Sequence, residues 1–127
     1  MEEQRQFVRL DTRLNASYTV LSTGTAEHTV TKNVGGGGIC LFTERVLVPG
    51  TRLQVAMQLL EGERTVHFVA EVVWSEAYEV IGKTERRRAV ETGMRFVEIA
   101  PADQDAVMQH VILRLQNNRG QPPISLG

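Results

Sequence analysis

The chain has 127 residues, of which 42% are hydrophobic and 23% are charged, which is the ordinary composition of one globular domain with a real core. Its net charge of -1 gives no case for a nucleic-acid or anionic-membrane partner, so an anion would have to be bound by a local cluster of basic residues. The single cysteine, Cys40, excludes an internal disulfide and a zinc site built from cysteines, and its apolar neighbours predict a buried, unreactive thiol.

Residues 1–13 are polar and form a predicted N-terminal arm. They lack the apolar core of a signal peptide, and no apolar run in the chain approaches the length of a membrane span. We therefore expect a cytoplasmic protein that does not insert into a membrane. Arg5, Arg9 and Arg13 recur at every fourth residue of the arm, without a matching apolar stripe.

Alternation of apolar and polar residues, typical of β-strands, fills most of the chain after the arm. The strand-like runs cover residues 14–21, 27–32, 39–42, 52–59, 65–74 and 90–99. Short strands separated by turn sequences predict an antiparallel sandwich or barrel. The long polar stretch 75–88 predicts a solvated loop or, alternatively, a docking patch for a partner.

An amphipathic helix is predicted after the last strand. Pro101 suits a first helical turn, and apolar residues recur at helical spacing from Val107 to Leu115. The sequence Asn-Asn-Arg-Gly at 117–120 ends the pattern. We expect this helix to pack on an open end of a barrel, followed by a disordered tail.

Residues for catalysis or metal binding are not grouped in the sequence. His28, His67 and His110 are isolated, and no two have the spacing of metal ligands. The four glycines at 35–38 lack the Lys-Ser or Lys-Thr of a phosphate-binding loop. We therefore expect no metal site and no enzyme activity. The glycine run itself predicts either a flexible hairpin loop or a bare backbone surface for a ligand, with the Asn33 amide at its edge.

Two motifs resemble those of the PilZ family, whose domains are receptors for the bacterial second messenger cyclic di-GMP. Arg5 and Arg9 match its RxxxR motif, whereas Asn33 and Gly38 match the ends of D/N-x-S-x-x-G, with Gly35 in place of the serine. Further similar segments are Pro-Gly-Thr at 49–51, Val-Val-Trp at 72–74 and Gly-Met-Arg-Phe at 93–96. The resemblance implies an all-β fold with one helix, a six-stranded antiparallel β-barrel with a C-terminal α-helix.

The resemblance also implies a cyclic di-GMP site between the arm and the glycine loop, with no other cofactor. Arginines would donate to phosphate or guanine, and glycines would let backbone N–H groups approach the ligand. Trp74 is expected to be half-buried and offers a stacking face. Arg13 is interpreted as a surface charge, with a ligand contact as the alternative. The candidate ligand-binding residues are Arg5, Arg9, Arg13, Asn33, Gly35, Gly36, Gly37, Gly38 and Trp74.

Two functions are compatible with these residues. The first is a stand-alone receptor, in which cyclic di-GMP orders the arm and changes a surface that contacts an unidentified partner protein. The second is a degenerate PilZ-like adaptor with weak or no ligand binding, which the missing serine favours. The expected organisation is a ligand-binding arm over residues 1–13, a barrel and helix over 14–118, and a disordered tail over 119–127.

Overall fold

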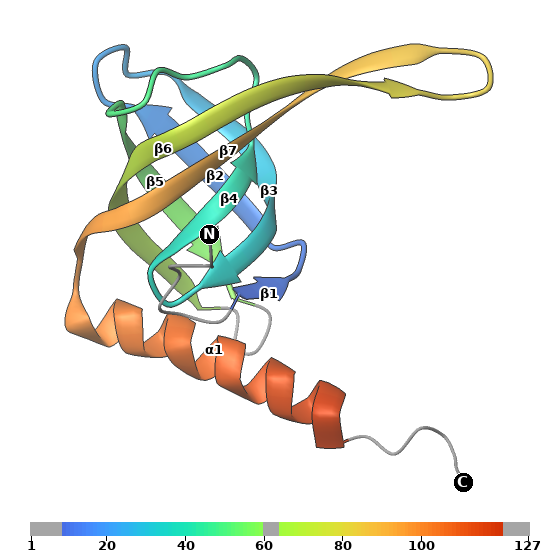
Figure 1. Ribbon diagram of the computed structural model, residues 1–127. Helices are drawn as coiled ribbons and strands as arrows, with labels where there is room; N and C mark the ends of the chain where they lie inside the picture. The colour runs from blue at the N-terminus through green and yellow to red at the C-terminus, as the bar shows by residue number, and fades with distance from the viewer. Residues whose placement is uncertain (1–8, 60–63, 121–127) are drawn as a thin grey trace, which may run out of the picture.

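The structure, a computed structural model, describes residues 9–59 and 64–120, with side chains up to residue 116. Six antiparallel strands close into a β-barrel, and one helix lies across an end of it (Figure 1). The elements are β1 (Arg9–Asp11), β2 (Asn15–Val20), β3 (Ala26–Gly35), β4 (Gly38–Phe42), β5 (Arg52–Gln58), β6 (Thr65–Ile81), β7 (Arg86–Ile99) and α1 (Pro101–Gly120). Among the described residues, no helix is long and apolar enough to cross a membrane.

The barrel closes because β4 pairs with strands on both of its sides. Around the ring the order is β3-β2-β5-β6-β7-β4, and β4 pairs back onto β3. The short β1 also pairs with β3, beyond the end of β2. The expected six-stranded antiparallel barrel with a C-terminal helix is thereby confirmed.

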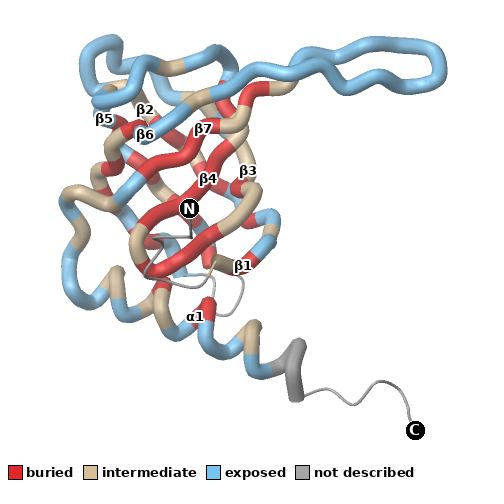
Figure 2. Tube along the Cα trace, viewed as in Figure 1, coloured by how far each residue is buried: buried red, intermediate tan, exposed pale blue. Residues whose placement is uncertain are grey.

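Alternation along the strands places one face of each strand in the core (Figure 2). In β5, Leu53, Val55 and Met57 are fully buried, while the residues between them are not. In α1, Val107 and Val111 are buried against the barrel. Burying an aliphatic side chain of this size stabilises the fold by about 1.5–3 kcal/mol, so these two residues fix the helix across the barrel end.

Two boundaries differ from those expected from the sequence. Residues 9–11 were assigned to the polar arm but form β1, because Leu10 is 6% exposed and joins the core. The helix runs to Gly120, so it includes two residues that were assigned to the tail. The rest of the arm, residues 1–8, and the rest of the tail, residues 121–127, lie outside the described residues.

The polar stretch 75–88 is not a loop but the outer half of a β-hairpin. There β6 and β7 continue as a two-stranded ribbon that projects from the barrel, with pairing as far as Ile81 and Arg86 (Figure 1). Nearly all of this ribbon is exposed on both faces, as Figure 2 shows. A strand with no buried face needs no apolar alternation, which is why the sequence pattern there indicated a loop.

Candidate functional site

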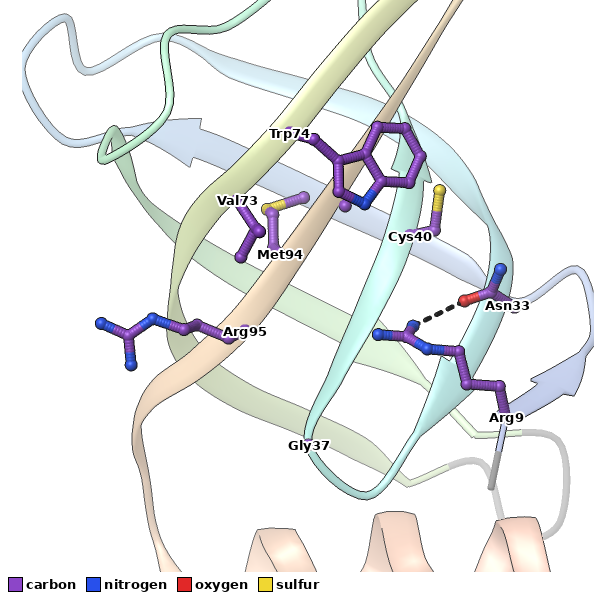
Figure 3. Close-up of a pocket in the computed structure, with 9 residues that line it drawn as sticks. Arg9, Asn33, Gly37, Cys40, Val73, Trp74, Met94 and Arg95 are labelled. Carbon is purple, nitrogen blue, oxygen red and sulfur yellow. Dashed lines mark hydrogen bonds between the residues drawn. The ribbon is translucent and has the colours of Figure 1, made fainter. Parts of the chain in front are cut away.

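A row of four paired residues crosses the outer wall of the barrel. Asn33 in β3 pairs with Cys40 in β4, Cys40 pairs with Gly93 in β7, and Gly93 pairs with Trp74 in β6. The two middle residues are small, whereas the two outer ones carry large polar or aromatic side chains. The row therefore forms a hollow of about 140 Å³, which Arg9 and other residues complete (Figure 3).

A β-bulge at each end of this row turns the outer side chains away from the core. The register of β3 shifts between Thr31 and Asn33, and that of β6 shifts between Val72 and Trp74. An extra residue in a strand reverses the alternation beyond it. Thus Thr31 and Val72 are buried, whereas Asn33 is only partly buried and Trp74 is 43% exposed. Without the bulge, simple alternation from Val66 to Trp74 would place Trp74 on the same face as the core residues of its strand.

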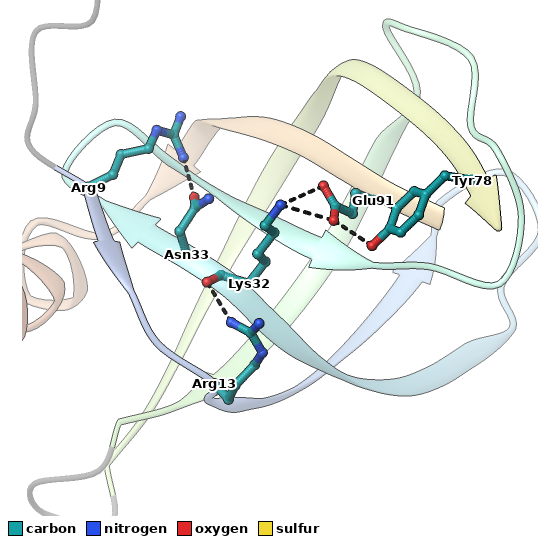
Figure 4. A network of polar contacts seen from close by, with 6 residues as sticks. All are labelled: Arg9, Arg13, Lys32, Asn33, Tyr78 and Glu91. Atoms are coloured by element: carbon teal, nitrogen blue, oxygen red, sulfur yellow. Dashed lines mark hydrogen bonds and ion pairs between the residues drawn. The ribbon is translucent and has the colours of Figure 1, made fainter. Parts of the chain in front are cut away.

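Arg9 and Asn33 are joined at one side of the hollow. Arg9 lies opposite Gly35 in the β1–β3 ladder, and its Nη1 donates to Asn33 Oδ1 at 2.8 Å (Figure 4). The sequence motifs of the arm and of the glycine loop are therefore in direct contact. Arg5, the other arginine of the arm motif, lies outside the described residues.

The four glycines occupy three different environments. Gly35 belongs to β3, Gly36 and Gly37 form the bend, and Gly38 begins β4. A Cβ at residue 38 would collide with the carbonyl oxygen of Met94, so sheet packing alone requires that glycine. Gly37 lines the hollow, and its carbonyl accepts from the Phe96 N–H at 3.1 Å. None of the four has a positive φ, since among the described glycines only Gly24 and Gly50 do.

Arg13, a candidate from the arm, does not line the hollow. Its Nη1 donates to the carbonyl of Lys32 at 2.9 Å, and its guanidinium carbon lies 5.5 Å from the centroid of the Phe42 ring. Cation–π contacts at such distances are worth about 0.5–1 kcal/mol at exposed sites. The structure thus gives Arg13 local contacts on the barrel wall.

Sequence reasoning did not select Arg95, which lines the hollow at its far end (Figure 3). Its Nη2 donates to Glu71 Oε1 at 2.6 Å, so the guanidinium is held toward β6. The signal that could have identified it is its place in the Gly-Met-Arg-Phe segment, which was used only as a fold marker. Cys40 is buried as expected, and burial raises the pKa of its thiol to about 11.

A second polar cluster lies beside the hollow, where the ribbon leaves the barrel. Lys32 Nζ contacts the two carboxylate oxygens of Glu91 at 2.9 and 3.0 Å, and the Tyr78 hydroxyl donates to the same carboxylate at 2.6 Å (Figure 4). Burial by itself raises the pKa of Glu91, but the hydrogen bonds from Tyr78 and Lys32 outweigh it and the pKa is lowered. Glu91 is therefore held as a carboxylate that ties β3 to the base of the ribbon.

No three His, Cys, Asp or Glu side chains come together as a potential metal site within the described part of the chain. The groups that line the hollow are suited to binding a ligand. The hollow provides a guanidinium, an amide, an exposed indole and the backbone of a glycine bend, which suit an anionic ligand with a flat ring system.

The chain is a small β-barrel domain. Its antiparallel barrel is closed, one helix lies across an end of the barrel, and a polar hollow lies on the barrel wall. The family model described as PilZ domain matches residues 3–113, and the chain belongs to this family. A search of curated proteins found no match.

Several solved structures are similar to this chain. The Bacillus subtilis inhibitor of motility, MotI/DgrA, is 26% identical with a TM-score of 0.73, over 93% of this chain and 54% of that one. The PilZ domain of Escherichia coli YcgR with c-di-GMP is 17% identical with a TM-score of 0.71, over 94% of this chain and 100% of that one. The complex of K. pneumonia MrkH with c-di-GMP is 16% identical with a TM-score of 0.73, over 94% and 56% respectively. The chain thus spans about half the length of MotI/DgrA and MrkH.

Proposed function

We propose that this domain is a receptor for cyclic di-GMP and that the ligand binds at the hollow between Arg9, Asn33 and Trp74. The observation that carries the proposal is the contact between Arg9 and Asn33, because it brings together two motifs that lie 24 residues apart in the sequence. Membership of the PilZ family and the c-di-GMP complexes of YcgR and MrkH support the same ligand.

Each wall of the hollow suits one part of this ligand. Cyclic di-GMP carries two phosphodiester charges and two guanines. A guanidinium such as that of Arg9 donates to phosphate oxygens or to guanine O6 and N7 in a bidentate pair. The indole of Trp74 offers a face on which a guanine stacks, and the bend at Gly37 lets the ligand approach the backbone.

The arm completes the site in this proposal. Arg5 precedes Arg9 by four residues, so an arm that closes over the ligand can bring both guanidinium groups to it. Ligand binding then orders the arm on the barrel and changes the surface available to a protein partner. We place this receptor in the cytoplasm, where a bacterial second messenger acts.

The alternative is a PilZ-like adaptor with weak or no ligand binding. The observation that favours it is Gly35, which stands where the family motif has serine and so removes one hydroxyl from the site. Gln4 stands before Arg5, where many members of the family have another basic residue, and this also weakens the attraction for phosphate.

Calorimetric titration of the full chain with cyclic di-GMP distinguishes the two functions. Cyclic di-AMP is the matched control ligand, because it has the same phosphodiester ring with a different base. Saturable binding that is tighter for cyclic di-GMP supports the receptor. The adaptor is supported if neither ligand binds with a dissociation constant below about 100 µM. This limit corresponds to about 5.5 kcal/mol of binding free energy.

A further inference from the structure

The outer parts of β6 and β7 form a projecting ribbon, residues 75–81 and 86–90 with the turn between them, whose two edges are free. The pairing of β6 with β5 ends at Glu71, and the pairing of β7 with β4 ends at Glu91. Val72 still bonds to Gly50 and Thr51, and Val90 still accepts from Thr43. Further out, the described residues 75–81 and 86–89 pair only with the other strand of the ribbon. Each edge therefore offers backbone groups to a further strand.

Two hydrogen bonds show which backbone groups point outward. The N–H of Gly82 donates to the carbonyl of Glu85 across the ribbon, whereas the carbonyl of Val90 accepts from Thr43 outside it. Inward and outward residues alternate along an antiparallel ladder. By this alternation the outward residues of the β6 edge are Ala77, Glu79 and Ile81, and those of the β7 edge are Arg86 and Arg88.

The two edges differ in their side chains. The β7 edge carries three consecutive arginines at 86–88, a charged pattern that normally protects an edge from pairing. The β6 edge carries Tyr78, Val80 and Ile81, which are 40%, 48% and 69% exposed. An exposed, apolar edge strand is the usual place for strand addition, so the β6 edge is the one available for pairing.

Charges on the ribbon are incompletely paired. Within the described part of the chain, Glu76 and Lys83 make no ion pair. Glu79 contacts Arg86 at 3.7 Å and lies opposite Arg88 in the register. A partner strand on the β6 edge should therefore present charges that complement Glu76 near the barrel and Lys83 near the tip.

We propose that the β6 edge pairs with the same edge of a second copy of this chain, antiparallel, with Glu79 on the two-fold axis. In this register Tyr78 lies opposite Val80 of the second copy, and Ala77 lies opposite Ile81. Aromatic and β-branched residues in such cross-strand positions stabilise a sheet by about 0.2–1 kcal/mol per pair. The outward groups of Ala77, Glu79 and Ile81 form about six backbone hydrogen bonds between the copies.

The same register accommodates the charges. Glu76 of one copy lies opposite Gly82 of the other, and Lys83 lies opposite Ser75, so in this register neither unpaired charge is opposed by a like charge. The two Glu79 carboxylates meet on the axis, but each is flanked by Arg86 and Arg88 of its own ribbon. The four-stranded sheet thus has no uncompensated charge at its centre.

The same register also decides where the two barrels lie. With Glu79 on the axis, Trp74 of one copy lies opposite residue 84 of the other, at the tip of its ribbon. Each barrel therefore begins where the ribbon of the other copy ends, and the two barrels lie at opposite ends of the shared sheet. An anionic membrane or nucleic acid is a poorer occupant, because the ribbon carries Glu76, Glu79 and Glu85 among its basic residues.

Sedimentation velocity of the full chain from about 5 to 500 µM tests the association. The expected result is a mass that rises from monomer toward dimer across this range. Glu79→Pro removes an outward N–H without removing a hydrogen bond of the ribbon, and it should weaken the dimer at least tenfold. Arg88→Pro on the β7 edge is the control and is compared with Arg88→Ala, because both changes remove the charge beside Glu79. These two variants should dimerise equally, and Glu79→Pro and Arg88→Pro should melt at the same temperature.

Oxidative cross-linking tests the register independently of proline. In a Cys40→Ser background, Glu79→Cys places one thiol on the two-fold axis and should give a disulfide-linked dimer, because opposed strand residues lie within disulfide distance. Arg88→Cys is the control and should give no disulfide-linked dimer. A mass that stays monomeric at every concentration, or cross-linking at residue 88 rather than 79, would overturn the proposal.

Discussion

The indole of Trp74 lies directly over Gly93, in the space that a Cβ atom at residue 93 would occupy. The two residues are partners across the β6–β7 ladder, and both line the hollow. Trp74 can form a wall of the hollow only because its neighbour has no side chain. Gly93 therefore has a packing role that also shapes the candidate ligand site.

We predict that Gly93→Ala displaces the indole and destabilises the domain by about 1–3 kcal/mol, as expected when a methyl group is forced into a packed contact. Urea unfolding measures the loss of stability. The fluorescence of Trp74, the only tryptophan of the chain, reports its displacement. Cyclic di-GMP binding should weaken together with the change in fluorescence.

Gly82→Ala is the matched control for this prediction. A Cβ at residue 82 would have its nearest neighbour, the carbonyl oxygen of Glu85, at 3.5 Å, which is an ordinary contact. This variant should unfold like the parent and retain its fluorescence. If Gly93→Ala behaves in the same way, Trp74 is not held by Gly93.

The sequence predicted the barrel well but not the details of the site. Core residues such as Leu53, Val55 and Met57 alternate in the sequence as they do in the structure, because a strand with one buried face imposes that pattern. The bulge before Trp74 could not be seen, because Val72 and Trp74 alternate correctly in the sequence while one extra residue changes the register between them.

Other parts of the fold left no periodic signal in the sequence. Both faces of the ribbon are exposed to solvent, so apolar and polar residues need not alternate along it. The strand β1 is too short to show a pattern. The Arg9–Asn33 contact could be expected only from the family motifs, because no local pattern links residues on different strands. Arg95 was missed because its strand served only to identify the fold.

We predict that Arg5→Ala and Arg9→Ala each weaken cyclic di-GMP binding about ten- to a hundredfold. A hydrogen bond that involves a charged group contributes about 1.5–3 kcal/mol, which corresponds to this range. Stability should change little for Arg9→Ala, because alanine keeps the backbone that pairs β1 with β3. Calorimetric titration and thermal melting of each variant measure the two effects.

Arg13→Ala is the natural control, because Arg13 lies in the same segment but does not line the hollow. It should bind cyclic di-GMP like the parent, apart from a small loss of long-range attraction that disappears at higher salt. Equal losses for Arg9→Ala and Arg13→Ala would show that net charge rather than the site decides affinity.

The buried Cys40 thiol predicts a loss of stability at alkaline pH. Burial raises the pKa of the thiol from 9.0 to about 11, so between these values the unfolded chain releases a proton that the folded chain retains. Stability should therefore be unaffected below about pH 9 and fall as the pH rises toward 11, by on the order of 2–3 kcal/mol. Urea unfolding at pH 8 and pH 10.5 measures this loss, and Cys40→Ala should reduce it. An equal loss in both proteins would assign the effect to other groups.

Our last prediction concerns Gly35, where the family motif has serine. Because Gly35 lies in β3 without a positive φ, its backbone angles do not exclude a side chain. A serine there adds a hydroxyl that can bond a guanine or brace the bend, a gain of about 0.5–1.5 kcal/mol. Replacing glycine also reduces the entropy of the unfolded chain, which is worth about 0.4–1 kcal/mol of stability.

We therefore expect Gly35→Ser to bind cyclic di-GMP about two- to tenfold more tightly than the parent and to melt at a slightly higher temperature. Gly36→Ser, one residue further along the bend, is the matched control, because it adds the same hydroxyl outside the family position. Tighter binding by Gly35→Ser alone would mean that the natural sequence carries a weakened receptor site. Unchanged or weaker binding, with the melting temperature intact, would mean that the bend has been rebuilt around glycine and that the role of the family's serine does not transfer to this position.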